Sequence, residues 1–321
     1  MKRLLLLLSL AAFAATAPAE TFPSKPVKIV VSYPPGGPVD LMARPLAAGL
    51  QDEWGGTTVI VENKPGANAI IGSDYVAKQH GDGYTLLFAN DPSLSSNQYL
   101  FSKLPYDPVK DLVPVAMIAS TTLILTVKSA LPVNNMQELL ELAKRKPGEV
   151  SYGSFGAGSV THLDTEAFAT AAGVKLLHVP YKGTADVVQA QMAGQLDMAF
   201  GAIGPVLPLI KSGKLRPIAV ASLQRQSLVP DVPTVSESGI PGFEARSWFG
   251  IAAPAGTPRP VIEKIAADVR KVVSQPEYRK KYILDQGLDV FDLGPDQFAE
   301  YLVKDRAKYA QRVKNANVRL D

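Results

Sequence analysis

The sequence predicts an α/β protein made of two lobes, each with a parallel sheet flanked by helices. Short β-branched runs alternate with helical periodicity through the first 220 residues, which is typical of strand–helix–strand units. The pattern restarts after the apolar stretch 113–127, which we expect to hold two extended segments around 120–122 where the chain crosses between lobes. The 321 residues, less an N-terminal segment of 19, match the length of two domains of about 150 each.

That N-terminal segment has the features of a secretory signal peptide. Lys2 and Arg3 precede an apolar run from Leu4 that ends in the A-x-A site 17–19. The apolar core is shorter than the roughly 20 residues that span a bilayer, so a retained membrane anchor is the weaker alternative. We expect cleavage after Ala19 and a periplasmic mature chain that starts at Glu20, which is not the cysteine that a lipoprotein requires.

The elements of the first lobe follow in order from 27. The spacing of apolar residues, together with turns that contain Gly or Pro, predicts strands at 27–32, 57–62 and 84–89. It predicts helices at 39–51 and 69–79. The second lobe is expected to hold helices at 135–144, 161–172, 184–193 and 205–211, and strands at 150–153, 176–179, 197–201 and 215–221.

A Pro-, Ser- and Gly-rich stretch at 230–242 is expected to carry the chain back to the first lobe, where 247–253 forms a strand. Pro258, Pro276 and Pro295 stand where proline opens a helix, so we expect the last sixty or so residues to be helical. The predicted first lobe is therefore discontinuous, 20–121 with 239–321, and the second lobe is 122–238.

Composition excludes several function classes. The net charge of +3 falls to about +1 once Lys2 and Arg3 are removed, and no basic run is present, so no nucleic-acid partner is expected. The absence of cysteine excludes disulfides, thiolate metal sites and Cys nucleophiles. His80, His162 and His178 are scattered without metal-ligand spacing. No phosphate-binding loop motif occurs, and Thr161 replaces the third glycine of a dinucleotide fingerprint, so no cofactor is expected.

Two glycine-containing turns, 34–37 and 156–159, each lie between the carboxyl end of a strand and the start of a helix. Open α/β sheets bind ligands at such places, and the amides of a helix start favour an anion. The alternative is that both are merely tight turns. Ser154, Ser159, Thr161 and His162 add polar groups around the second turn, although Ser159 also fits a helix cap and His162 a buried histidine.

A secreted hydrolase is the alternative from a different class of function. It would have to use Ser159, His162 and Asp164, which are close in sequence only, and no G-x-S-x-G elbow supports it. We therefore predict a binding protein and not an enzyme.

Several motifs in their order resemble the solute-binding proteins of tripartite tricarboxylate transporters, the Bug family of extracytoplasmic receptors. They are Tyr-Pro-Pro-Gly-Gly at 33–37 with Asp40 and Arg44, Val-Glu-Asn-Lys-Pro-Gly-Ala at 61–67, Leu-Pro-Tyr-Asp at 104–107, Val-Pro-Tyr-Lys-Gly at 179–183, Pro-Asp-Val-Pro-Thr at 230–234, and Trp248 with Ala-Pro-Ala-Gly-Thr-Pro at 253–258. The resemblance covers nearly the whole mature chain.

The resemblance implies a two-lobed periplasmic binding protein fold, type II-like, that closes on a small organic carboxylate between its lobes. It further implies delivery of the ligand to integral membrane permease subunits. We expect a monomer, and a ligand-sensing adaptor for a membrane signalling protein is the alternative role. The ligand-binding residues carried over or inferred from the turns are Pro35, Gly36, Gly37, Gly66, Ala67, Asn68, Ser154, Ser159, Thr161, His162 and Gly183.

Two positions bear on specificity. Gly201-Ala202 replaces a stretch that often bears Asp in the family, which hints at a ligand without an amino group. Arg246 is a candidate for a second carboxylate, although it fits a solvent-facing position equally well.

Overall fold

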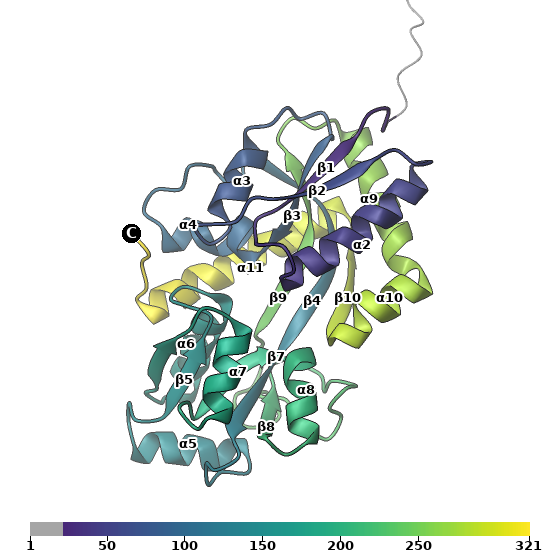
Figure 1. Ribbon diagram of the computed structural model, residues 1–321. Coiled ribbons are helices and arrows are strands. Elements are labelled where there is room, and N and C mark those ends of the chain that lie inside the picture. Colours follow the sequence, from purple (N-terminus) through teal and green to yellow (C-terminus); the bar gives the residue numbers. More distant parts are fainter. Residues whose placement is uncertain (1–21) are drawn as a thin grey trace, which may run out of the picture.

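The computed structural model describes residues 22–321, and the expected signal peptide and its cleavage site lie outside these described residues. The chain forms two α/β lobes, one above the other in Figure 1. The elements of the upper lobe before the crossing are β1 (Val27–Val31), α2 (Pro38–Glu53), β2 (Val59–Asn63), α3 (Ile70–Ala77), β3 (Thr85–Asn90), a π-helix η1 (Pro92–Ser96) and α4 (Asn97–Leu100).

The lower lobe follows a long strand that leaves the upper one, β4 (Leu112–Lys128). Its elements are α5 (Met136–Arg145), β5 (Ser151–Ser154), α6 (Val160–Ala172), β6 (Leu177–Pro180), α7 (Thr184–Met192), β7 (Met198–Ala202), α8 (Ile203–Lys211) and β8 (Leu215–Val220). The chain then returns through β9 (Arg246–Pro254), α9 (Arg259–Ser274), α10 (Pro276–Tyr282), a 3₁₀ turn η2 (Leu284–Gln286), β10 (Leu288–Leu293) and α11 (Pro295–Ala316).

The strand β4 connects the two lobes. The strand order is β2-β1-β3-β9-β4-β7-β5-β6, with β8 and β10 also paired to β4. The first half of β4 pairs with β9 and β10, and its second half pairs with β7 and β8. The prediction of two extended segments was therefore wrong, because one 17-residue strand runs through and changes its partners near Thr122.

The predicted strands and helices of both lobes are present within a few residues of their expected bounds, and the parallel pairing of β1 with β2 and β3, and of β5 with β6 and β7, is confirmed. Helix α2 shows why the local pattern works. Ala43, Leu46 and Leu50 are fully buried at helical spacing and share a core with Ile29 and Val31 of β1. Pro258, Pro276 and Pro295 do open helices, as expected.

Two features of the upper lobe were missed. The C-terminal sixty residues are not all helical, because 288–293 form β10, an antiparallel strand beside β4. The segment 92–100 forms the π-helix and the one-turn helix α4, although no helix was predicted there. Both elements depend on distant partners: β10 needs β4, and Leu100 packs with Leu163 and Tyr309.

Separate apolar cores underlie the two lobes. One contains Ile29, Leu46 and Ile251, and the other contains Leu125 and Phe200. The second core also takes in Ile240, Phe243 and Ala245, which precede β9. The division of the chain at 121/122 and 238/239 remains a prediction.

The long helix α11 leaves the upper lobe and contacts α6 of the lower one, as the yellow helix in Figure 1 shows. Residues 22–321 contain no helix with the length and hydropathy needed to span a bilayer.

Candidate functional site

The first glycine turn is held by Asp40. The buried Asp40 carboxylate accepts hydrogen bonds from the Gly36 amide (2.9 Å), the Arg44 Nε (2.8 Å) and the Asn63 Nδ2 (2.8 Å). Burial raises the pKa of Asp40, but these hydrogen bonds outweigh it and hold the pKa below its usual value. Asp40 thus joins the carboxyl ends of β1 and β2. Because the Gly36 N–H donates to Asp40, this amide is already hydrogen-bonded within the turn.

The carried-over residues of this turn remain accessible. Pro35 and Gly36 are exposed and Gly37, the residue before α2, is half-buried. Beside them the Tyr33 hydroxyl accepts a hydrogen bond from Asn90 Nδ2 (2.7 Å) at the end of β3. Burial raises the pKa of Tyr33 to about 12, so its hydroxyl stays protonated at neutral pH.

The second turn of this lobe, 66–69, has an unusual backbone. The φ angles of Gly66, Ala67, Asn68 and Ala69 are 130°, 47°, 50° and 72°, all in the region that side chains avoid. Each non-glycine residue there costs about 1–2 kcal/mol. The amides of Ala67, Asn68 and Ala69 donate to no group in the part of the chain that the structure describes. Successive free N–H groups of this kind form a concavity suited to an anion.

In the lower lobe, the turn between β5 and α6 is fixed by its own side chains. Ser159 caps α6, since its Oγ accepts from the His162 amide, and the same Oγ donates to the Gly156 carbonyl (2.7 Å). Thr161 Oγ1 accepts from the Phe155 amide (3.1 Å), and His162 Nδ1 accepts from the Gly158 amide (3.0 Å). The cap expected for Ser159 is confirmed, and His162 is buried.

Three aromatic rings stack behind this turn. The His162 and His178 rings lie 3.9 Å apart between centroids, and the Tyr152 ring lies 4.9 Å from that of His178. His178 Nε2 is 2.6 Å from Ser154 Oγ. Burial lowers the pKa of both histidines to about 4, and for His178 the neighbouring His162 adds to the effect. Both rings are therefore neutral at pH 7, and Nδ1 of His162 can accept a hydrogen bond.

Gly183 completes the sequence-predicted set. It precedes α7 in an extended conformation, half-buried, where a Cβ would meet nothing within 4 Å. The Tyr181 amide before it donates to the Ser154 carbonyl (2.9 Å), so the ends of β5 and β6 lie side by side.

The turns of the two lobes are linked through α4. Asn97 of α4 exchanges hydrogen bonds with Asn68, through the side chain (2.9 Å) and the Asn68 carbonyl (2.7 Å). One turn further on, Leu100 lies so close to Gly158 of the lower lobe that a Cβ there would stand 3.2 Å from its Cδ2 and 2.7 Å from Leu320. A side chain at 158 would displace these leucine ends and would be strained at φ 72°, so glycine is favoured there. Residues of α4 thus contact both turns.

Sequence reasoning missed Asn90, Asp91 and Asn97. Asn90 ends β3, Asp91 follows it, and Asn97 begins α4. A polar run at the end of an apolar strand is the signal that could have found Asn90 and Asp91. Trp248 of the family motif is fully buried, and its Nε1 donates to Asp305 Oδ2 (2.9 Å).

Arg246 lies beside the lobe crossing. Its guanidinium donates to Ser120 Oγ (3.0 Å) and lies 3.2 Å from a Glu244 oxygen, so it already has partners.

The arrangement does not assemble a catalytic triad. Ser159 Oγ bonds backbone atoms and approaches Thr161, His162 Nδ1 is occupied by the Gly158 amide, and Asp164 is paired with Arg312. Among residues 22–321, no cluster of three or more His, Cys, Asp or Glu side chains could hold a metal ion.

Two α/β lobes joined by long crossing strands, with polar turns from both at their junction, define a two-lobed solute-binding protein. The family described as "Tripartite tricarboxylate transporter family receptor" matches residues 42–318, and the chain belongs to it. It is a receptor of the periplasmic binding protein type, and the family is one of solute receptors and not of enzymes.

Individual relatives support this family assignment. The chain is 34% identical to protein BugT of Bordetella pertussis over 311 residues, 97% of this chain and 95% of BugT. Its fold superposes with a TM-score of 0.82 on an R. palustris protein solved with adipate, at 30% identity and covering 93% of this chain and 99% of that one. The protein MatC of Rhodopseudomonas palustris, solved with bound malate, gives a TM-score of 0.78 at 29% identity, covering 91% and 100%.

Proposed function

We propose that this receptor captures a small organic carboxylate between its lobes, performs no chemistry on it and delivers it to the membrane permease subunits of a tripartite transporter. The mature chain would act in the periplasm as a monomer after cleavage behind Ala19. The observation that carries the proposal is the left-handed turn 66–69, whose three consecutive amides lack a partner in the described part of the chain.

We assign the other wall to the lower lobe, where Ser159 and Gly183 are half-buried and Ser154, Thr161 and His162 lie buried behind them. Ser154, Ser159, Thr161 and His162 surround the start of α6, and Gly183 precedes α7. A carboxylate placed there would meet helix N-termini, each worth about 0.3–1 kcal/mol to an anion. The relatives solved with adipate and malate support a carboxylate as the ligand class.

The energetics do not require an arginine in the cleft. A micromolar Kd corresponds to about 8 kcal/mol. Hydrogen bonds to a charged group contribute roughly 1.5–3 kcal/mol each. Four to six of them, with the helix ends, reach that value after the cost of ordering the ligand.

Isothermal titration of the mature protein against citrate, linear dicarboxylates, aromatic acids and nicotinate tests the ligand class. Native mass spectrometry of the protein as purified would identify a co-purified acid. We expect at least one binder, and silence across the whole panel would contradict the proposal.

The variant Gly183→Leu tests the location. Residue 183 has an extended backbone and open space around its Cβ position, so the substitution leaves folding intact while it places a side chain in the cleft. We expect ligand affinity to fall at least about tenfold, the loss of one charged hydrogen bond or more. Ala130→Leu, an exposed site beyond the far end of β4, is the matched control. Equal affinity of both variants would move the site elsewhere.

A further inference from the structure

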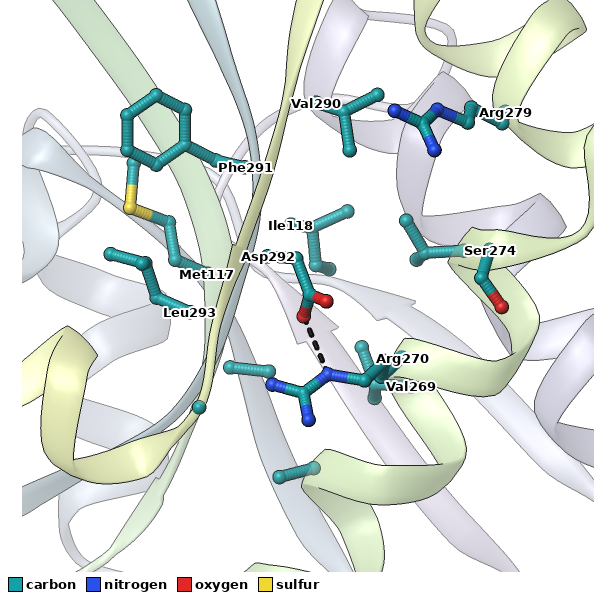
Figure 2. Close-up of a pocket in the computed structure, with 14 residues that line it drawn as sticks. Met117, Ile118, Val269, Arg270, Ser274, Arg279, Val290, Phe291, Asp292 and Leu293 are labelled. Atoms are coloured by element: carbon teal, nitrogen blue, oxygen red, sulfur yellow. Dashed lines mark hydrogen bonds and ion pairs between the residues drawn. The ribbon is translucent and has the colours of Figure 1, made fainter.

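The upper lobe contains a pocket away from the turns described above. It has a volume of about 350 Å³ and lies between β4, α9, α10 and β10. Figure 2 shows Val290 and Asp292 of β10 pointing toward α9, while Phe291 and Leu293 point to the other face of the strand. All its walls belong to one lobe, so a ligand could enter without lobe closure.

The pocket lies beside an irregularity in the sheet. Val290 pairs with Ala119 and Leu293 with Met117, so three residues of β10 advance against two of β4. The extra residue interrupts the regular pairing of β10 with β4 opposite Ile118. Such bulges are common beside binding sites, because they redirect side chains.

The floor of the pocket is apolar. Ile118, Val269 and Val273 are buried members of the upper-lobe core, and their side chains form its base. A volume of 350 Å³ lies within the range of small-molecule sites, which are mostly apolar with a few polar groups at defined positions.

The rim is charged and net positive. Its charged groups are Arg270, Arg279 and Asp292. Arg270 Nε donates to Asp292 Oδ1 (2.7 Å), which leaves the outer nitrogens of Arg270 unbound by that carboxylate. The Arg279 guanidinium has no hydrogen-bond or ion-pair partner within residues 22–321, and Figure 2 shows it at the opposite end of the pocket from Arg270.

We propose that this pocket is a second ligand site, for a small amphipathic anion whose apolar body lies on Ile118, Val269 and Val273 and whose carboxylate binds Arg279. The Asp292 carboxylate disfavours a second negative group at the Arg270 end, so the ligand is a monocarboxylate with an apolar tail. A guanidinium binds a carboxylate through two parallel hydrogen bonds, which gives the contact its geometry. The site is independent of the cleft, and the failure of either proposal leaves the other standing.

The probe is octanoate, with octanol and octylammonium as matched uncharged and cationic molecules. Titration into the mature protein is followed by methyl NMR. We expect octanoate to shift the methyl signals of Ile118, Val269 and Val273 and to bind about tenfold more tightly than octanol. Octylammonium should bind more weakly still.

Two variants complete the test. Arg279→Gln should weaken octanoate about tenfold, whereas Lys281→Gln, which removes the same charge from the same helix outside the pocket, should change it less than about twofold. Ser274→Trp, at an exposed rim position, should block binding without affecting the fold. Any of three results would overturn the proposal: octanoate shifts only the signals of the turn residues, wild type and Arg279→Gln bind it equally, or no small probe binds.

Discussion

Arg312 of α11 and Asp164 of α6 form a buried ion pair that joins the C-terminal helix to the lower lobe. The Arg312 Nη2 also donates to the Glu244 carbonyl (2.6 Å), just before β9. Asp164 lies two residues after His162, so the pair fixes the helix that carries one wall of the proposed cleft. Burial raises the pKa of Asp164, and the guanidinium opposes that rise.

Removal of the arginine should be strongly destabilising. Arg312→Met leaves Asp164 buried without its cation, and we expect a loss of about 3–5 kcal/mol in the free energy of unfolding, measured by urea titration. Arg259→Met, which breaks exposed pairs with Glu263 and Asp296, should cost less than about 1 kcal/mol. The double variant Arg312→Met/Asp164→Leu should recover much of the loss, and a double variant as unstable as the sum would contradict this account.

The stacked histidines should make stability fall with acid. Their pKa values are lowered to about 4 in the folded chain, whereas an unfolded histidine titrates near 6.5. The unfolded state therefore binds more protons between these values, and the contribution of the pair is complete above about 6.5 and is lost as the pH falls toward 4. His178→Phe should reduce this pH dependence of the urea midpoint. The exposed His80→Gln variant serves as the control, and a slope unchanged by His178→Phe would refute the assignment.

Asp91 should make the stability of the protein fall as the pH rises, opposite to the effect of the histidines. Its carboxyl receives hydrogen bonds from the Tyr309 hydroxyl (2.9 Å) and the Trp248 amide (3.1 Å), and it is fully buried at the end of β3. Burial, with the nearby Asp305, raises its pKa to about 7. The folded state then binds the extra proton, so the contribution of Asp91 is complete below about pH 4 and is lost as the pH rises through 7. Asp91→Asn should lose less stability than the wild type as the pH rises from about 4 to 7. Parallel stability curves for the two proteins would exclude this role.

The strained backbone of the left-handed turn should lower the free energy of unfolding and strengthen binding of the cleft ligand. Ala67→Gly relieves a strain of about 1–2 kcal/mol at φ 47° and adds the greater flexibility of glycine, worth about 0.5–1 kcal/mol in the opposite direction. We expect a net gain of roughly 0.5–1 kcal/mol in unfolding free energy, together with weaker binding of the cleft ligand, because the amides are less firmly held. Calorimetric melting and titration on the same variant check both. A variant that is less stable and binds more tightly would refute the strain argument.

Much of the fold could be predicted because its information is local. Ala43, Leu46 and Leu50 recur at helical spacing, and the strand Val27–Val31 is β-branched and apolar except at Lys28. Pro258, Pro276 and Pro295 open helices, so each element follows from its own residues. The two glycine turns were also visible, since strand, turn and helix are contiguous in the chain. Their identity as site residues rests on their place between strand ends and helix starts and on the family resemblance, and it remains a prediction.

The sequence by itself determined the alternation of strands and helices, the positions of the polar turns and the family to which the chain belongs. Only the tertiary structure decided that 112–128 is one strand, that 288–293 leaves the helical pattern to pair with it, and that Asp164 meets Arg312. The physical reason is that these features exist through contacts between residues far apart in the chain, whose energy depends on packing and burial and has no counterpart in local periodicity.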